Sequence, residues 1–263
     1  MKKTLMILSA VALLAACSGK PAFDPATVAD ATAEQVTRVE PLSWWTGMKM
    51  PLQLLVQGEN ISEYDVAIEG GAGVSVEKIN KADSPNYLFV DVKIAANAQP
   101  GTYYIVFSKD GQSFKYPYEI ASRREGSAER TSFTTADMIY LIMPDRFANG
   151  DPSNDSVEGM PDKADRSKPF GRHGGDIQGI IDHLDYISEL GATAIWCTPL
   201  IEDNLEKTTY HGYACTDYYH IDGRFGDNDL FKRYVEKAHE KDLKIIMDIV
   251  PNHAGSGHWW MAD

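Results

Sequence analysis

The sequence is poor in basic side chains relative to acidic ones. Its 25 lysine and arginine residues stand against 38 aspartate and glutamate residues, which gives a formal net charge of -13. Nucleic-acid binding draws most of its affinity from clustered lysine and arginine, so no nucleic-acid partner is expected. A neutral ligand such as a sugar suits this charge better.

The chain also lacks an apolar run long enough to span a membrane comfortably at its start. The run from Leu5 to Ala16 is too short for this, follows two lysines and ends before Cys17. This pattern is typical of a bacterial export signal, and the sequence Leu-Ala-Ala-Cys resembles the lipoprotein processing box. We expect residues 1–17 to hold a lipoprotein signal peptide, with an ordinary cleaved signal as the alternative.

The lipoprotein box implies acylation of Cys17 and tethering of the mature protein to a membrane of the bacterial cell envelope. Ser18 follows the cysteine, which is similar to outer-membrane sorting signals. We expect an outer-membrane lipoprotein that faces the periplasm, and leave open display on the cell surface. Residues 18–35 would form the tether.

Only Cys197 and Cys215 remain after Cys17. The cell envelope is oxidising, but two cysteines cannot be assigned to a disulfide without geometry. We expect two free thiols and leave pairing open.

Short β-type runs separated by turn signals dominate residues 36–121. The sequence predicts a small immunoglobulin-like β-sandwich here, with strands at Leu52–Val56, Tyr64–Ile68, Tyr87–Ile94, Thr102–Phe107 and Phe114–Ile120. The charged, apolar-poor stretch that follows, residues 122–131, suits a linker between domains.

Residues 132–263 alternate between strand and helix patterns. Helical spacing of apolar residues predicts one helix from Ile177 to Leu190 and another from Asp229 to Lys241. Apolar runs of strand length lie at Met138–Met143, Ala192–Trp196 and Lys244–Val250. This alternation indicates a parallel sheet.

Two parallel architectures compete, a doubly wound sheet and a (β/α)8 TIM barrel. No glycine-rich phosphate loop follows the first strand, which disfavours the nucleotide-binding sheet. A barrel needs ~250 residues. Residues 132–263 supply about three βα units, so we expect the first part of an incomplete barrel.

The most specific stretch is the hexapeptide Asp-Ile-Val-Pro-Asn-His from Asp248 to His253, at the end of the third strand. A carboxylate in an apolar run is costly to bury unpaired, and barrel active sites form at the carboxyl ends of strands. Asp248 is therefore a functional candidate. A buried structural ion pair is the alternative.

This hexapeptide resembles the first short signature of the α-amylase superfamily, glycoside hydrolase family 13. Further stretches resemble that family in order along the chain: Asp145-Arg146-Phe147, Gly174-Gly175-Asp176 and Tyr210-His211-Gly212-Tyr213. The preceding β-domain resembles the N-terminal module of the neopullulanase and cyclomaltodextrinase branch. The likeness covers nearly the whole mature chain.

The resemblance implies a starch-degrading glycosidase that hydrolyses maltodextrin, pullulan or cyclodextrin by a retaining double displacement. In the family, the nucleophile and the acid follow strands four and five, so neither role is assigned within this chain and the chain alone is expected to be inactive. A non-catalytic glycan-binding envelope lipoprotein and a transglycosylase on the same scaffold are the alternatives. Homodimerisation is left open.

The family also implies roles for four residues. Tyr213 would be the flat platform under a glucosyl ring, with His211 lining the same subsite. His253 would bind the 6-hydroxyl of that ring, and Asp248 would orient the catalytic machinery. Tyr213 as a core aromatic, and His253 as a helix cap or metal ligand, remain alternatives.

The loop after the first strand is rich in oxygen donors, which hard Ca²⁺ prefers. It is similar to a calcium loop of related cyclodextrin-acting enzymes, which implies a structural Ca²⁺ held by Asn149, Asp151, Asn154, Asp155, the Gly174 carbonyl and Asp176. An Asx-rich turn without metal is the alternative.

Trp44 and Trp45 form an aromatic pair in the β-domain. Such a pair can stack on glucan, but packing under a sheet or against a neighbouring domain is the interpretation we favour.

Overall fold

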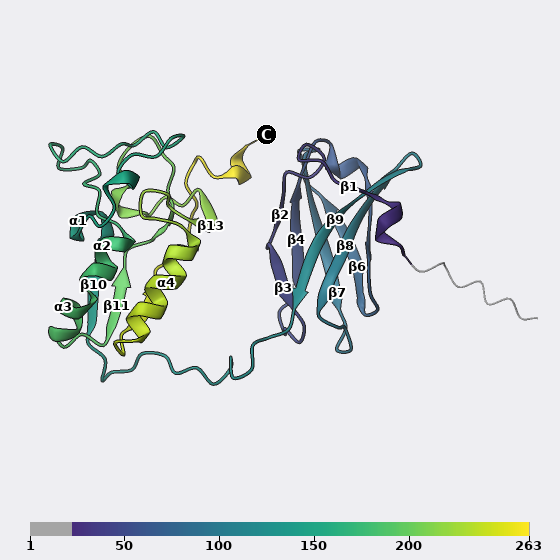
Figure 1. Cartoon of the computed structure of the whole chain (residues 1–263). Coiled ribbons are helices and arrows are strands. Elements are labelled where there is room, and N and C mark those ends of the chain that lie inside the picture. Colours follow the sequence, from purple (N-terminus) through teal and green to yellow (C-terminus); the bar gives the residue numbers. More distant parts are fainter. Residues whose placement is uncertain (1–22, 263) are drawn as a thin grey trace, which may run out of the picture. The chain divides into compact units, whose positions relative to one another are not determined.

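The computed structural model describes residues 23–262, and the chain divides into two compact units, Met1–Ala128 and Glu129–Asp263 (Figure 1). Cys17 and the predicted export signal lie outside the described residues, so the lipid anchor stays a prediction. Within residues 23–262, no helix has both the length and the apolar character needed to cross a membrane.

The first unit is the expected β-sandwich of two sheets. One sheet has the antiparallel order β2 (Arg38–Glu40), β4 (Leu52–Gln57), β7 (Tyr87–Ile94), β6 (Val74–Lys81). The other has the order β1 (Ala29–Asp30), β9 (Gln112–Ala121), β8 (Gly101–Lys109), β5 (Asp65–Glu69), with β3 (Ser43–Trp45) also on β9. Short 3₁₀ turns η1 (Pro25–Thr27) and η2 (Ile61–Glu63) complete the unit. The prediction of a tether over residues 18–35 is wrong for its second half, because β1 pairs with β9 and so belongs to the sandwich.

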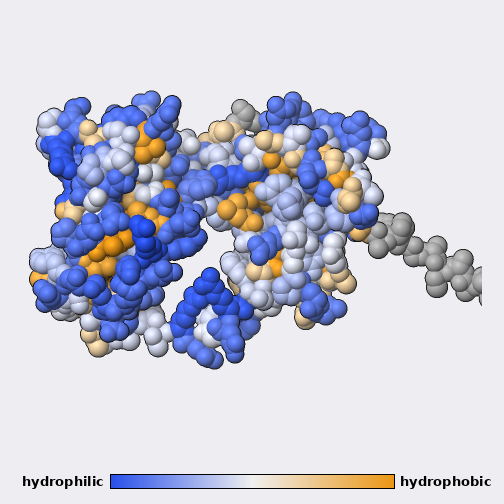
Figure 2. Space-filling model, viewed as in Figure 1, coloured by the Kyte–Doolittle hydropathy of each residue, from blue (hydrophilic) through white to orange (hydrophobic). Residues whose placement is uncertain are grey.

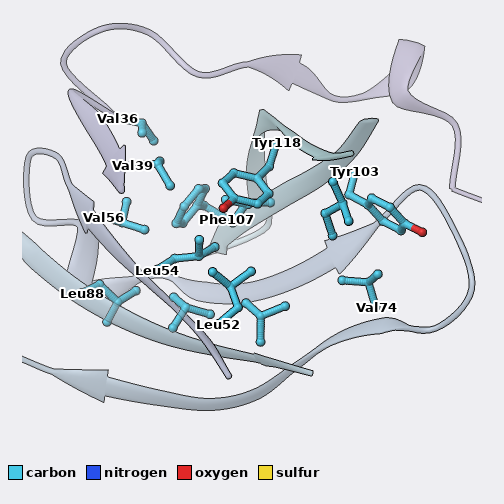
Figure 3. Close-up of a cluster of buried hydrophobic side chains, with 14 of the residues drawn as sticks. Val36, Val39, Leu52, Leu54, Val56, Val74, Leu88, Tyr103, Phe107 and Tyr118 are labelled. Carbon is cyan, nitrogen blue, oxygen red and sulfur yellow. The ribbon is translucent and has the colours of Figure 1, made fainter. Parts of the chain in front are cut away.

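Alternation along the strands builds the sandwich core. On β4, Leu52, Leu54 and Val56 are buried while Gln53 is exposed, as a strand covered on one face requires. These side chains meet Phe107 and Tyr118 from the other sheet (Figure 3). The tight turn between β8 and β9 places both Asp110 and Gly111 at positive φ, the geometry that fits the twist of a two-residue hairpin.

The tryptophan pair lies on β3, a strand that the sequence did not predict. Its side chains divide between core and surface: the Trp44 ring packs against the sandwich core, whereas Trp45 is 39% exposed. Core packing therefore accounts for Trp44, and Trp45 faces outward.

The second unit contains a parallel sheet of three strands in barrel order, β10 (Ile139–Ile142), β11 (Ala194–Cys197) and β14 (Lys244–Met247). It is the predicted first part of a barrel. Its other elements are α1 (Pro144–Phe147), α2 (Ile177–Asp182), α3 (Leu184–Glu189), α4 (Asn228–His239), the ribbon of β12 (Ile201–Glu202) and β13 (Asp217–Ile221), and the 3₁₀ turns η3 (Pro152–Asn154), η4 (Thr209–His211) and η5 (Trp259–Met261).

The single helix expected from Ile177 to Leu190 is instead two short helices, α2 and α3, broken at His183. The backbone of His183 leaves helical geometry at φ -115° and ψ 14°. Its ring Nδ1 donates to the Gly179 carbonyl oxygen at 2.7 Å. The apolar spacing continues across the break because both helices pack against the same core, so periodicity alone does not reveal it.

One face of the parallel sheet is covered and the other is open. Ile142 and Ile195 pack with residues of the helices, whereas Ile139, Leu141 and Trp196, which alternate to the other face, are exposed although they are apolar. Figure 2 shows local hydrophobic patches on a largely hydrophilic surface. The open apolar face is what the inward side of barrel strands presents when further strands do not cover it.

Both described cysteines are free, as expected. Cys197 and Cys215 are buried and unpaired with each other. Burial raises the pKa of the Cys197 thiol to about 12, which keeps it protonated and unreactive.

Candidate functional site

The candidate site lies at the carboxyl end of the parallel sheet, where β14 ends just before Asp248. The Asp248 Oδ2 atom accepts hydrogen bonds from the Trp196 Nε1 at 3.0 Å and from the Tyr213 hydroxyl at 3.1 Å. Trp196 comes from β11, and Tyr213 from the loop after η4. Asp248 thus joins two strands and a loop. Its partners are neutral donors, and within residues 23–262 no cation forms an ion pair with it, so the structural ion pair finds no support here.

The two histidines of the predicted site also contact Tyr213. The His253 Nε2 donates to the Tyr213 carbonyl oxygen at 2.9 Å, and the Tyr213 amide donates to the His211 Nδ1 at 3.0 Å. Burial lowers the pKa of His211, which favours the neutral ring that an accepting nitrogen requires. The four residues predicted from the sequence therefore form one contiguous group.

Tyr213 presents its ring to solvent. The residue is 38% exposed, so it is not a core aromatic, and burial together with Asp248 raises the pKa of its hydroxyl. His253 is exposed and lies outside any helix. An exposed aromatic face flanked by polar groups is suited to the apolar C–H face of a sugar ring.

Glycine is required next to the platform. Gly212 has φ +75°, and a Cβ atom there would overlap the carbonyl oxygen of Pro199. The loop can therefore approach the end of β11 only with glycine at this position, and this close approach brings Tyr213 over the edge of the sheet.

A buried ionic cluster that the sequence did not predict supports the same loop. Asp222 binds Arg224 through two contacts, Oδ1 to Nε at 2.9 Å and Oδ2 to Nη2 at 2.7 Å. Arg224 Nη2 also donates to the Asp203 carbonyl oxygen at 2.6 Å, and the Asp203 Oδ2 accepts from the amide of Ala214, next to Tyr213, at 3.1 Å. All three charged residues are almost fully buried.

The only sequence signal for this cluster is the opposite charges of Asp222 and Arg224 two residues apart. Burial alone would raise the pKa of Asp222, but hydrogen bonds and charge from Arg224 hold it below its usual value. For Asp203, burial and the neighbouring Asp222 carboxylate raise the pKa to about 6. Burial thus acts in the same direction on both carboxyl groups, and the net pKa shifts are opposite because Arg224 outweighs burial at Asp222.

The raised pKa of Asp203 predicts a pH dependence of stability. The carboxyl titrates near 3.8 when unperturbed and near 6 in the folded protein, so between these values the folded state binds more protons than the unfolded state. The free energy of unfolding should therefore fall as the pH rises from 4 to 6 and level off above. Asp203→Asn, which resembles the protonated carboxyl, should remove this contribution.

Urea unfolding of the two proteins at pH 4, 5, 6 and 7 measures the effect. The stability of Asp203→Asn relative to the unmodified protein should grow by about 2 kcal/mol over this range, since each pKa unit corresponds to ~1.4 kcal/mol and solvent screening reduces the sum. A difference that does not change with pH would contradict the prediction.

The predicted calcium residues come together between the loop after β10 and the start of α2. The buried Asp176 carboxylate accepts hydrogen bonds from the amides of Gly150 at 3.1 Å, Asp151 at 2.8 Å and Gly179 at 2.6 Å. The Asn149 Nδ2 donates to the Asp155 Oδ1 at 2.6 Å. A Cβ atom on Gly174 would overlap that same Asp155 oxygen.

Two amide oxygens in this loop suit a cation. The Oδ1 atoms of Asn149 and Asn154 are buried and accept no hydrogen bond, which is costly unless another group binds them. Within the described part of the chain, no three His, Cys, Asp or Glu side chains form a metal cluster, so the set mixes amide and carboxylate oxygens. Asp151 differs from the other predicted calcium ligands, because its Oδ1 accepts hydrogen bonds from Ser153 and caps η3. The donor set fits Ca²⁺, a cation that binds oxygen ligands.

Two family models match separate parts of the chain. Residues 141–263 match the α-amylase catalytic domain, and residues 38–124 match the N-terminal domain of cyclomaltodextrinase. The first match contains the candidate site, and the second contains most of the β-sandwich.

Three curated relatives each match a little under half of the chain. Neopullulanase 2 of Thermoactinomyces vulgaris is 46% identical over 131 residues, which cover 47% of this chain and 21% of that protein. A cyclomaltodextrinase of Bacillus sp is 43% identical over 118 residues, 45% of this chain and 20% of that protein. A β/α-amylase of Paenibacillus polymyxa is 47% identical over 117 residues, 44% of this chain and 10% of that protein. The chain thus spans a tenth to about a fifth of these three proteins.

Along this chain, the cyclomaltodextrinase-type module precedes the amylase-type sheet. Residues 141–263 thus belong to the α-amylase catalytic-domain family and residues 38–124 to the cyclomaltodextrinase N-terminal family, which is consistent with the neopullulanase and cyclomaltodextrinase branch of glycoside hydrolase family 13.

Proposed function

We propose that the full-length protein hydrolyses α-glucosidic bonds in maltodextrin, pullulan or cyclodextrin, and that Tyr213 is the platform for a glucosyl unit beside the scissile bond. The observation that carries this proposal is the contact of Tyr213 with both Asp248 and His253 at the carboxyl edge of the sheet. Relatives named cyclomaltodextrinase and neopullulanase support the substrate class.

The three side chains divide the work of holding a sugar. The Tyr213 ring supplies an apolar face. His253 would bind a hydroxyl group of the same sugar in exchange for one of the two hydrogen bonds its ring now makes, from Nε2 to the Tyr213 carbonyl oxygen and from Asn252 to Nδ1. Asp248 uses only Oδ2 for Trp196 and Tyr213. Its Oδ1 receives no donor from the described residues, which suits the orienting role expected for this carboxylate.

A retaining glycosidase needs one carboxylate that attacks and one carboxylic acid that protonates the leaving oxygen. We assign neither role to a described residue. The open apolar face of the sheet, with Ile139, Leu141 and Trp196 exposed, supports a catalytic domain in which further strands cover this face and supply those groups.

Reducing-sugar release by the full-length protein tests the proposed function. Maltodextrin, pullulan and cyclodextrin are the substrates, and the β-linked cellodextrins are the control. We expect release from at least one α-glucan and none from cellodextrin, with most activity lost in His253→Ala. Binding of α-glucans without any release would instead favour the glycan-capturing alternative, and longer oligosaccharide products would indicate a transglycosylase.

We further propose that a structural Ca²⁺ binds the loop after β10 through the amide oxygens of Asn149 and Asn154 and the carboxylates of Asp155 and Asp176. Such an ion would fasten this loop to the start of α2. Because it would bind only the folded state, it would stabilise the protein by mass action.

Removal of calcium should lower the melting temperature by about 5 °C. Thermal unfolding with and without a chelator measures this, and Asn149→Ala should abolish the response. Asn204→Ala is the matched control, because Asn204 also has a buried Oδ1 that accepts no hydrogen bond but lies outside this loop, and its chelator response should be that of the unmodified protein. An unmodified protein whose melting curve is the same with and without the chelator would argue against the site.

A further inference from the structure

A cavity of about 730 Å³ lies in the barrel unit between the loop before α2 and the segment before η4. Its volume is within the range of ~300–1,000 Å³ that is usual for small-molecule sites. Residues 161–165 and 168–171 form one wall, and residues 206–208 form the other.

Phe170 lines the cavity and is 71% exposed, which is unusual for a large apolar side chain. Its backbone is nonetheless held on both sides, because the Arg146 Nη2 donates to the carbonyl oxygens of Pro169 at 3.1 Å and of Gly171 at 2.8 Å. Arg146 is in turn fixed by its Nε contact with the buried carboxylate of Asp145 at 2.8 Å. The structure thus anchors the two neighbours of an exposed phenylalanine.

A series of neighbouring aromatic rings connects Tyr213 with Arg146, the residue that holds the Phe170 segment. The ring centroids of Tyr213 and His211 are 5.7 Å apart, and those of His211 and Tyr210 are 5.2 Å apart. The Arg146 guanidinium lies 4.3 Å from the centroid of the Tyr210 ring. The wall formed by residues 206–208 directly precedes η4, so the cavity and the platform share one stretch of chain.

The charges around the cavity balance. Three lysines line it, Lys163, Lys168 and Lys207, and so do three acidic residues, Asp162, Asp165 and Glu206. Lys168 and Asp165 pair with each other at 3.0 Å. An anionic or a cationic ligand gains little from such a lining, whereas a neutral ligand with many hydroxyl groups finds both donors and acceptors. An exposed aromatic ring can stack on the apolar face of a sugar, and the surrounding charged side chains can bind its hydroxyl groups.

We propose that this cavity is an additional subsite for the same α-glucan chain, in which Phe170 stacks on a glucosyl unit distant from the one on Tyr213. The proposal rests on the proposed function, because it assigns one more unit of the same substrate to the protein. A short oligosaccharide that covers only the Tyr213 platform would not reach Phe170, so the subsite should act on long chains alone.

Kinetics of the full-length protein on maltotriose and maltoheptaose test the subsite. Phe170→Ala should raise the KM for maltoheptaose about tenfold, equivalent to ~1.4 kcal/mol, and leave kcat and the maltotriose KM unchanged. Phe170→Tyr, which keeps the ring, should restore the KM of the unmodified protein. Tyr186→Ala is the matched control, since Tyr186 is an aromatic residue 51% exposed on α3, and it should change neither constant.

Two results would overturn the subsite: no effect of Phe170→Ala on either substrate, or an equal effect on both, which would place Phe170 in the structure of the loop instead. If the unmodified protein cleaves neither oligosaccharide, the proposed function fails separately. Calorimetric binding of maltoheptaose then decides the subsite, with loss of binding in Phe170→Ala in its favour and equal or absent binding against it.

Discussion

Replacing Tyr213 with alanine should lower the kcat/KM of the full-length protein on maltodextrin about a hundredfold, or ~3 kcal/mol of transition-state stabilisation. The change removes the exposed ring, and with it the hydroxyl that donates to Asp248. It also leaves the backbone contacts of the loop with His211 and His253 in place. The loss should therefore arise from substrate positioning and not from unfolding.

Tyr213→Phe is the matched variant, because it keeps the ring and removes only the hydrogen bond to Asp248. Its loss in kcat/KM should be about tenfold or less. Initial rates at several substrate concentrations separate the two effects, and the melting temperature of each variant serves as a check on folding. Equal activity of Tyr213→Ala and the unmodified protein would show that the ring carries no substrate.

Arg224→Met should lower the free energy of unfolding by about 3–5 kcal/mol, the usual cost of breaking a buried ion pair by removing one partner. Both side chains of the Arg224–Asp222 pair are 1% exposed. Without the guanidinium, the Asp222 carboxylate would be buried with no compensating charge from Arg224. Urea unfolding followed by circular dichroism measures the loss.

Two variants distinguish this ion pair from simple loss of a side chain. Arg224→Met combined with Asp222→Asn should recover part of the stability, because no unpaired charge is then buried. Lys232→Met removes an exposed partner of Asp229, in a pair of the same 2.7 Å length on α4, and should leave the stability nearly unchanged. Similar losses in Arg224→Met and Lys232→Met would contradict the role of burial.

Local sequence patterns were sufficient to predict much of the fold. The strand predicted at Tyr87–Ile94 has those bounds in the structure, because an apolar run between strong turn signals leaves little freedom. The strand predicted to reach Val250 ends at Met247, and the edge strand β3 was missed. Both depend on pairing with distant strands, which no local pattern encodes.

The residues of the candidate site were likewise predicted only in part. Tyr213, His253 and Asp248 lie in short motifs, so their types and spacing were enough to bring them forward as candidates. Asp203 and Arg224 were not identified, because their pairing depends on how a long loop folds back on itself. Phe170 was missed for a related reason: its exposure depends on contacts made by Arg146, which precedes it by more than twenty residues in the chain.

The most direct test of the central claim follows the anomeric protons by nuclear magnetic resonance while the full-length protein acts on maltoheptaose. A retaining α-glucan hydrolase must release products whose new reducing end is first the α-anomer, with the β-anomer appearing only by later mutarotation. We predict this order, and we predict a much slower reaction for Tyr213→Ala. Absence of cleavage, or release of the β-anomer first, would contradict the assignment of this site to a retaining α-glucan hydrolase.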